Sequence, residues 1–508
     1  MVALWVTSLS VVGLAQDNPV VNGLFGDHMV LQRGMPVPVW GTCKAGTKVT
    51  VRFGTQEKTA EAGTDGRWMV KLDALNASSA PAEMTITSAT GNTPKKIVDI
   101  LVGDVWLCSG QSNMEMQMES VKADDDIAQA DYPPLRHCWH GNGWVASTPK
   151  TVGSFTATGF YFGRRIHRET GIPVGLLNNS IGGTSIETWI PPEAFEATAG
   201  MRDMVKEKVS SYRAASLKTI SEVEAWLPSA RAAVQGDKDV PALPHLDSSP
   251  RTEVNSGFAV KFIPETLPLI PYAIKGMIWY QGEANGGDGD VYTVKLSALI
   301  TGLRKAWNEG DFPVYFVQLP NGGGGNANPD GGDGWAKIRM AQFKALALKN
   351  TGMAVTIDTS ETGDIHPFDK LDVGNRLAQL ALAKDYGKNF VASGPLYKSM
   401  KVEGNEIRVS FENVGKGLMI GKKNGKEPLQ EVAGGKLEQF AIAQSDAAAV
   451  SGLKWYWADA VIDGATVVVS SLSVTNPVAV HYAYTSNPLG NKLYNKDGLP
   501  ASPFRTND

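Results

Sequence analysis

The chain is poor in cysteine and has no excess of either charge. Its 508 residues include three cysteines, Cys43, Cys108 and Cys138, which are too few for a disulfide framework. His137 and His140 lie on either side of Cys138, but the sequence has no second group of ligands that would complete a zinc site with them. We expect no metal and no organic cofactor. The net charge is −4, which gives no electrostatic footprint for nucleic acid or an anionic membrane, so we expect neither as a partner.

Long apolar runs are absent after the first 15 residues, so no later segment is predicted to span a bilayer. Residues 1–15 are apolar and uncharged, and Gly13 and Ala15 fit the small-residue rule of a signal-peptide cleavage site. A basic leader is missing there. We expect a possible signal peptide at 1–15 and a secreted or periplasmic protein; the alternative is a disordered or strand-forming N-terminus.

The hydrophobic content of 43 % is typical of a globular protein with sizeable cores. Short β-rich runs separated by turn residues predict an N-terminal β domain over 20–99. Strands and helices then alternate over 100–393, which predicts an α/β domain with a parallel sheet. Residues 394–508 return to short strands, which predicts a C-terminal β domain.

One buried strand ends abruptly in small and polar residues. The apolar run 100–108 is followed by Ser109-Gly110-Gln111-Ser112-Asn113, and a turn of this kind can hold a hydroxyl at the rim of a sheet. Ser112 is therefore the candidate nucleophile; the alternative is an ordinary strand followed by a polar turn. The segment is not the G-x-S-x-G nucleophile elbow, because Met114 occupies the place of the second glycine.

Three further polar segments also follow predicted strands. They are Gly182-Gly183, Gln281 to Asn285, and Asp358 to His366. Because ligands bind beyond the carboxyl ends of the strands in open α/β sheets, we expect these segments to converge with Ser112 at one rim.

Acyl transfer by a serine needs an imidazole that takes the hydroxyl proton. His366 is the candidate base, and Asp364 could hold its tautomer and stabilise the imidazolium. An ordinary loop histidine and a turn aspartate are the alternatives. For the oxyanion we expect the Ser112 N–H, an N–H of Gly182 or Gly183, and the amide of Gln281, with Asn285 as second choice. Tight-turn glycines and self-bonding amides are the alternatives there.

Four side chains near these segments are candidates for substrate binding: Glu187, Glu283, Asn285 and Trp189. Trp189 could stack on a sugar ring, although core packing is an equal alternative. Glu187 and Glu283 could instead form the carboxylate pair of a glycosidase, which is a separate hypothesis.

Taken together, the motifs resemble those of the sialate O-acetylesterase family in the SGNH (GDSL-like) hydrolase superfamily, in particular its bacterial secreted members. The matching stretches run in order along the chain: 24–33 (LFGDHMVLQR), 106–114 (WLCSGQSNM), 181–189 (IGGTSIETW), 279–285 (WYQGEAN), 363–367 (GDIHP) and 493–506 (LYNKDGLPASPFRT). The resemblance implies a flavodoxin-like three-layer α/β/α catalytic domain with accessory β-sandwich-like domains at both ends.

The resemblance also implies that Ser112 is the nucleophile, that His366 is the base, and that Gly182 or Gly183 and Gln281 take the family's oxyanion positions. The superfamily places Asp three residues before the histidine, where this chain has Gly363, so a Ser–His dyad remains an alternative to a triad with Asp364. The Asn-Asp of the superfamily's third block is replaced by Gln281-Gly282-Glu283.

The expected function is hydrolysis of acetyl esters on sugars through an acetyl-enzyme. An acetylxylan esterase with the same mechanism and a non-catalytic carbohydrate-binding protein are the alternatives. The expected partner is an O-acetylated sugar or glycan. The sequence does not choose between sialic acid and xylan, and it does not indicate an oligomeric state.

Overall fold

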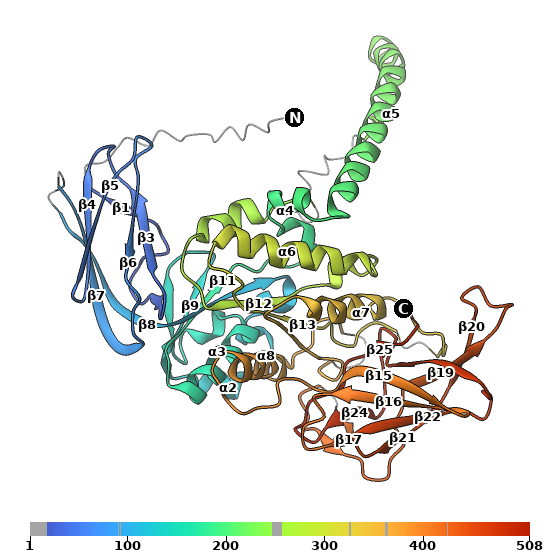
Figure 1. Cartoon of the computed structure of the whole chain (residues 1–508). Coiled ribbons are helices and arrows are strands. Elements are labelled where there is room, and N and C mark those ends of the chain that lie inside the picture. The colour runs from blue at the N-terminus through green and yellow to red at the C-terminus, as the bar shows by residue number, and fades with distance from the viewer. Residues whose placement is uncertain are drawn as a thin grey trace.

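The computed structural model of the chain describes residues 18–89, 91, 93–245, 257–324, 327–360, 364–423 and 425–507. The predicted signal peptide, residues 1–15, lies outside these described residues. Within the described part of the chain, no helix has the length and apolar character needed to cross a membrane. The protein is a mixed α/β structure with β-rich regions at both ends of the chain (Figure 1).

The central sheet contains the strands that the alternating pattern predicts and two that it does not, β9 and β10. Its order is β10-β9-β11-β8-β12-β13-β14. All neighbouring pairs are parallel except β10 with β9. The bounds are β8 Lys95–Gly110, β9 Tyr132–Trp139, β10 Trp144–Ser147, β11 Val174–Asn178, β12 Gly276–Tyr280, β13 Val314–Val317 and β14 Thr351–Ala354.

Helices cover both faces of this sheet (Figure 1). Along β8, Val105 and Leu107 share a core with the helix α6, whereas Trp106 and Cys108 share a second core with α3 and α8. This alternation is the period of a strand buried on both faces. The helix bounds are α3 Ala157–Thr170, α6 Val291–Trp307, α7 Ala336–Lys344 and α8 Lys370–Lys384.

Strand β8 belongs to two regions of the molecule. Its first half pairs with β7 and β2, and its second half pairs with β11 and β12. The N-terminal β region is therefore joined to the central sheet by one continuous strand. Its other strands are β1 Val20–Val21, β2 Val30–Gln32, β3 Val37–Thr42, β4 Lys48–Phe53, β5 Gln56–Glu61, β6 Arg67–Leu72 and β7 Ser78–Ser88.

The C-terminal β region consists of antiparallel strands in three sheets, ordered β15-β16-β22-β21, β18-β17-β24 and β20-β19-β23-β25. Their bounds are β15 Leu396–Glu403, β16 Glu406–Glu412, β17 Leu418–Lys422, β18 Gln430–Glu431, β19 Phe440–Ser445, β20 Leu453–Trp457, β21 Asp459–Asp463, β22 Thr466–Ser470, β23 Pro477–Tyr482, β24 Lys492–Asn495 and β25 Phe504–Arg505.

The remaining helices lie in the connections. They are α1 Ser112–Glu115, α2 Asp124–Ala128, α4 Pro192–Ala197 and α5 Met201–Gln235. The long helix α5 projects away from the body of the molecule (Figure 1).

Helices α3 and α8 approach so closely that one position requires a glycine. A Cβ atom at Gly374 would lie 2.6 Å from the Tyr161 Cβ, 2.7 Å from the Thr158 carbonyl oxygen and 2.8 Å from the Phe162 nitrogen. Backbone atoms cannot move aside as a flexible side chain can. Packing of this helix pair, which supports the second core, therefore depends on the absence of a side chain at residue 374.

We expect Gly374→Ala to lower the free energy of unfolding by about 1–3 kcal/mol, because overpacked cores shift backbone and rotamers. Chemical denaturation of the purified variant measures this change. Gly26→Ala is the matched control, since a Cβ atom there meets nothing within 4 Å. Equal midpoints for the two variants would contradict the close approach.

Candidate active site

Ser112 and His366 lie side by side although 254 residues separate them. Ser112 is the first residue of α1, directly beyond β8, and its Oγ is 2.9 Å from the Nε2 of His366. Both residues are partly exposed. The prediction that the two side chains meet at the carboxyl end of the sheet is confirmed.

The loop that carries His366 has to reach back across the sheet. It follows β14, and β12 and β13 lie between β14 and β8. At about 4.8 Å per strand, the ends of β8 and β14 are about 14 Å apart. The Asn113 side chain spans part of this gap, because its Nδ2 donates to the carbonyl of Ile365 at 2.9 Å. Asn113 therefore ties the segment of the serine directly to the residue before the histidine.

Asn113 also joins two buried ionisable side chains. Its Nδ2 donates to Glu283 Oε1 at 2.5 Å, and its Oδ1 accepts from Lys370 Nζ at 2.5 Å. Burial raises the pKa of Glu283, and the second oxygen of that carboxyl has no partner within the described residues. Burial lowers the pKa of Lys370 to about 7, against the opposing charge of Glu283. Lys370 Nζ also lies 5.3 Å from the centre of the Tyr280 ring.

The environment favours the neutral form of His366. Its pKa lies below the usual value, first because the ring is partly buried and second because the Lys370 charge is near; Asp364 acts in the opposite direction. A neutral imidazole is the form that accepts a proton, so the ring is poised as a base at neutral pH.

Asp364 makes a different contact from the expected one. Its Oδ1 accepts the backbone N–H of His366 at 2.8 Å. Within the part of the chain that is described, the His366 ring makes one hydrogen bond, the one to Ser112. The expected contact between Asp364 and the imidazole is therefore absent from this arrangement; a carboxylate two residues before the histidine closes a short backbone turn instead.

The Gly182 N–H already binds an anionic oxygen. It donates to Glu115 Oε2 at 2.6 Å. A Cβ atom at residue 182 would lie 2.8 Å from that oxygen and 3.4 Å from the Ser112 Cβ, so a side chain there would displace the Glu115 carboxylate. The next residue, Gly183, is exposed with φ of 71°, a left-handed conformation that favours glycine.

The Gln281 amide is used inside the protein. Both of its hydrogens are donated, to the carbonyl of Thr184 at 3.1 Å and to Asn285 Oδ1 at 2.7 Å, and its Oε1 accepts from Tyr292. Gln281 is fully buried. In this arrangement it cannot donate to an oxyanion, which corrects the sequence prediction, since burial of the turn directs the amide inward.

Asn285 and Glu187 belong to the same internal network. The Asn285 Nδ2 donates to Glu187 Oε2 at 3.0 Å, and Lys295 forms an ion pair with the other oxygen of Glu187. Burial raises the pKa of Glu187, but the Lys295 charge together with the hydrogen bonds from Lys295 and Asn285 holds it below its usual value. Both side chains thus have partners within the protein, and their role in substrate contact stays a prediction.

Trp189 is buried, whereas Glu283 is partly exposed. Trp189 is 1 % exposed, and its Nε1 donates to Thr184 Oγ1 at 3.0 Å. It packs edge-on against Trp279. The core alternative therefore holds for Trp189. Glu283 binds Asn113, whereas Glu187 binds Lys295 and Asn285, so each carboxylate has its own protein partners.

Three residues at this site were missed by the sequence analysis: Asn113, Glu115 and Lys370. Asn113 and Glu115 lie within three residues of Ser112, so proximity to the nucleophile was an available signal. Lys370 carried none, because its burial follows from the packing of α8. No group of three or more His, Cys, Asp or Glu side chains that could hold a metal ion is found among the described residues.

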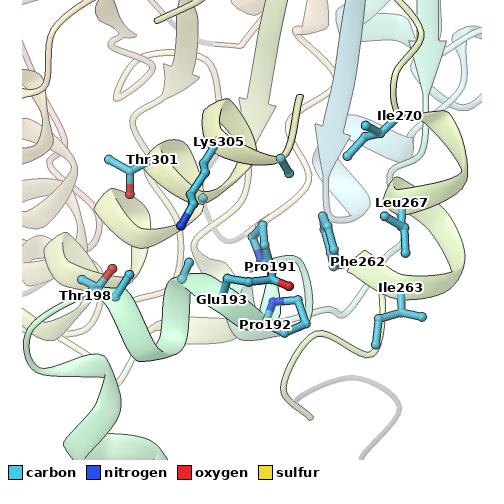
Figure 2. Close-up of a pocket in the computed structure, with 14 residues that line it drawn as sticks. Pro191, Pro192, Glu193, Thr198, Phe262, Ile263, Leu267, Ile270, Thr301 and Lys305 are labelled. Atoms are coloured by element: carbon cyan, nitrogen blue, oxygen red, sulfur yellow. The ribbon is translucent and has the colours of Figure 1, made fainter. Parts of the chain in front are cut away.

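An apolar cavity lies away from Ser112 and His366. It has a volume of about 600 Å³ and is bordered by α4, α6 and the turn around Phe262, and its described lining includes neither of these two residues (Figure 2).

Several known proteins are similar to this chain. The family model described as "carbohydrate esterase, sialic acid-specific acetylesterase" matches residues 102–227 and 260–383. The sialate O-acetylesterase of Rattus norvegicus is 30 % identical over 430 residues, which cover 74 % of this chain and 75 % of the rat protein. The chain belongs to the sialate O-acetylesterase family. The family consists of carbohydrate esterases, so this protein is a carboxylic ester hydrolase.

Two more relatives cover nearly the whole chain. The human sialate O-acetylesterase is 27 % identical over 541 residues, covering 94 % of this chain and 90 % of the human protein. The crystal structure of a carbohydrate acetylesterase from Xanthomonas citri has a TM-score of 0.75 and 31 % identity, covering 96 % of this chain and 99 % of that chain. The family resemblance predicted from the motifs is confirmed.

We expect the imidazole of His366 to titrate below 6.5 in the free protein. Replacing Asp364 by Asn removes the negative charge that favours the imidazolium, so Asp364→Asn should lower this pKa further. NMR titration of the imidazole Cε1–H signals measures both values. The protein has seven histidines, and the signal lost in His366→Asn assigns the resonance. A titration above 6.5, or an increase in Asp364→Asn, would refute the stated electrostatics.

Proposed function

We propose that the protein is a serine esterase of the SGNH type that removes acetyl groups from O-acetylated sugars, with Ser112 as nucleophile and His366 as general base. The observation that carries the proposal is the distance of 2.9 Å between Ser112 Oγ and His366 Nε2. A serine hydroxyl becomes an effective nucleophile when an adjacent imidazole accepts its proton. The lowered pKa of His366 supplies the neutral ring that this step requires.

In the first half-reaction, Ser112 Oγ attacks the acetyl carbonyl carbon and its proton passes to His366 Nε2. The tetrahedral intermediate collapses, the bond to the sugar oxygen breaks, and the sugar alcohol leaves with the proton from His366. In the second half-reaction, His366 takes a proton from water and the resulting hydroxide attacks the acetyl carbonyl carbon. The bond to Ser112 Oγ then breaks, His366 returns its proton to Ser112, and the product leaves as acetic acid, which ionises to acetate in water. The proton balance closes on His366 in both halves, so no cofactor is required.

Backbone donors near Ser112 are the proposed oxyanion site. The Gly182 N–H binds the carboxylate of Glu115 at 2.6 Å in the free protein, which supports its ability to bind an anionic oxygen. The developing oxyanion would replace this carboxylate as the acceptor of the Gly182 N–H. The N–H groups of Ser112 and Gly183 would also donate to it. Removal of one such donor typically costs about 3–4 kcal/mol in the transition state. Gln281 then acts indirectly, by holding the loop at Thr184 that follows these glycines.

The active site is best described as a Ser112–His366 dyad in which Asp364 braces the backbone of the histidine. Asn113 completes the arrangement, because it fixes the carbonyl of Ile365 from the serine side. Asp364 also tunes the pKa of the ring through its charge.

O-acetylated sialic acid is the proposed substrate, since the rat and human relatives carry that activity in their names. Acetylated xylan is the second candidate, because the Xanthomonas citri relative is described only as a carbohydrate acetylesterase. The domain boundaries 20–99, 100–393 and 394–508, the three-layer α/β/α description with accessory β domains, and export of the protein through residues 1–15 are part of the same proposal.

Substitution of Ser112 tests the catalytic proposal. We expect Ser112→Ala to lower acetate release from O-acetylated sialic acid by at least about 10³-fold, since loss of a triad nucleophile has effects of 10⁶ in a serine protease. Enzymatic determination of acetate measures the rate, and acetylated xylan is assayed in parallel to identify the substrate.

Ser120→Ala is the control, because Ser120 is an exposed serine eight positions along the chain. It should retain the activity of the unmodified protein. Equal turnover by Ser112→Ala and the unmodified protein would remove the esterase mechanism. A protein that binds these glycans but releases no acetate in any variant would favour the carbohydrate-binding alternative.

Asp364→Asn distinguishes the dyad from a triad. Asn retains an oxygen for the His366 backbone N–H, so we expect kcat to fall by less than about tenfold, whereas loss of the acid of a triad costs about 10⁴-fold. The acidic limb of the kcat/KM profile should move to lower pH, because neutral His366 persists to lower pH without the carboxylate. A loss of 10³-fold or more would instead assign Asp364 to the imidazole.

A further inference from the structure

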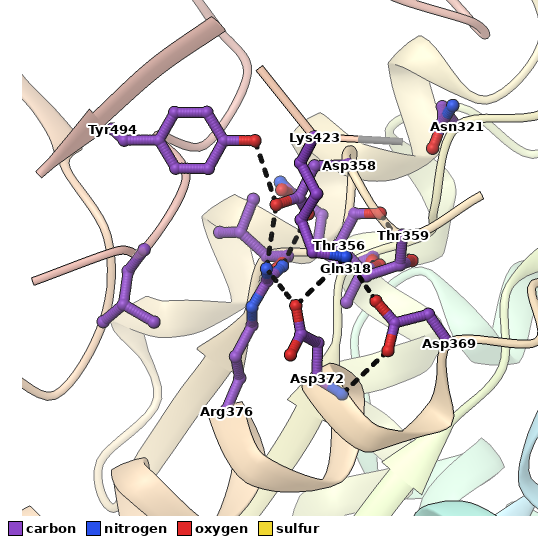
Figure 3. Close-up of polar contacts among 12 residues, drawn as sticks. Gln318, Asn321, Thr356, Asp358, Thr359, Asp369, Asp372, Arg376, Lys423 and Tyr494 are labelled. Carbon is purple, nitrogen blue, oxygen red and sulfur yellow. Dashed lines mark hydrogen bonds and ion pairs between the residues drawn. The ribbon is translucent and has the colours of Figure 1, made fainter. Parts of the chain in front are cut away.

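The C-terminal β region contacts the helix that follows the histidine. Lys423, directly after β17, places its Nζ 2.5 Å from Asp369 Oδ2 and 3.2 Å from Asp372 Oδ2. The exposed fractions of the Lys423 and Asp369 side chains are 5 % and 3 %, so this ion pair is excluded from water. Figure 3 shows Lys423 reaching the two carboxylates at the start of α8.

Asp369 connects this ion pair to the catalytic loop. It lies three residues after His366, and its Oδ1 accepts the N–H of Asp372 at 3.0 Å, which caps the N-terminus of α8. The next residue is Lys370, whose Nζ binds Asn113 beside Ser112. The segment from His366 to Lys370 is thus fixed on one side by the C-terminal β region and on the other by the serine segment.

A second contact joins the same two regions behind Lys423. The Tyr494 hydroxyl of β24 donates to Asp358 Oδ2 at 3.0 Å, and Arg376 of α8 binds both oxygens of Asp358 at 2.6 and 2.8 Å (Figure 3). Burial alone would raise the pKa of Asp358, but the charge and hydrogen bonds of Arg376, together with the charges of Lys423 and Lys492, hold that pKa below its usual value. The start of the histidine loop is therefore anchored to the C-terminal β region as well.

The serine side is contacted by a neighbouring lysine. Lys426 Nζ donates to the carbonyls of Val121 and Lys122, each at 2.6 Å. These residues follow α1, the helix that Ser112 begins. Lys122 in turn lies over the ring of Phe368 at 4.2 Å, two residues after His366. Lys423 therefore contacts the segment that follows the histidine, and Lys426 contacts the segment that follows the serine.

We propose that the C-terminal β region is a working part of the active site, in which Lys423 and Lys426 are positioning residues that clamp the histidine-bearing and serine-bearing segments at their observed separation. The inference rests on the proposed catalytic roles of Ser112 and His366. Neither lysine touches the reacting atoms; each acts through the backbone or the carboxylate that it binds.

Loss of either lysine should affect turnover more than substrate binding. A displacement of about 1 Å at a catalytic pair can cost about 10²-fold in rate. We expect Lys423→Met to lower kcat by about 10- to 100-fold and Lys426→Met by about 3- to 10-fold, with KM changed by less than about threefold in both. The smaller effect is expected for Lys426 because it is the more exposed of the two.

Lys422→Met is the matched control. Lys422 is the exposed last residue of β17, adjacent to Lys423, and its replacement should leave both kcat and KM unchanged. A double-mutant cycle with Asp369→Asn tests the route of the effect. If Lys423 acts through Asp369, the double variant should lose no more activity than the more impaired single variant.

Acetate release by the full-length protein and its unfolding temperature are measured for every variant. Inactivity of the unmodified protein, or full activity of Ser112→Ala, would refute the proposed function itself. With those two controls as expected, unchanged kcat in folded Lys423→Met and Lys426→Met would overturn the clamp alone. If Lys423→Met does not fold, Lys426→Met decides by the same criterion. Additive losses in the cycle would overturn the route through Asp369.

Discussion

One buried amide, that of Asn113, holds together two segments that leave the central sheet three strands apart. The strand order β8-β12-β13-β14 separates the ends that carry Ser112 and His366, and no covalent connection shortens that gap. Asn113 is adjacent to Ser112, and its amide binds the carbonyl of Ile365, the residue before His366. This hydrogen bond sets where the histidine loop can lie. The hydrogen bond between Ser112 and His366 thus depends on the contact of Asn113 with Ile365 as well as on the strand order.

The surroundings of Asn113 explain why it is costly to disturb. Its carbonyl oxygen receives Lys370 and its amide donates to Glu283, so an amide bridges two ionisable groups in a region of low dielectric constant. Leaving a buried polar group without its hydrogen-bond partner typically costs about 1–3 kcal/mol, and more where that group is charged. Burial lowers the pKa of Lys370. The partial burial of His366 and the nearby Lys370 charge lower the pKa of His366. The network that fixes the geometry therefore also favours the neutral base.

The sequence predicted those features that follow from hydrophobic periodicity and from the positions of strand ends. Strand β12 and helix α3 followed from apolar patterns, and the meeting of Ser112 with His366 followed from the rule on carboxyl ends. Strand β9 was missed because Pro133-Pro134 interrupts its pattern, and α8 because charged residues obscure its apolar face. The direction of a polar group was not predictable, since it depends on burial created by distant segments. The Gln281 amide turns inward, whereas the Gly182 N–H donates to Glu115.

The position of β14 gives the C-terminal β region its structural role. This strand is the edge of the central sheet, with β13 as its one neighbour in the strand order, so the loop after it has no adjacent strand to support it. Edge strands in native proteins are commonly covered by another element, and here Tyr494 and Lys423 supply that cover through Asp358 and Asp369. The proposed nucleophile stands on an interior strand with neighbours on both sides, whereas the proposed base follows an edge strand. The base is therefore the half of the site that needs support from outside the sheet, which is where the C-terminal β region is placed.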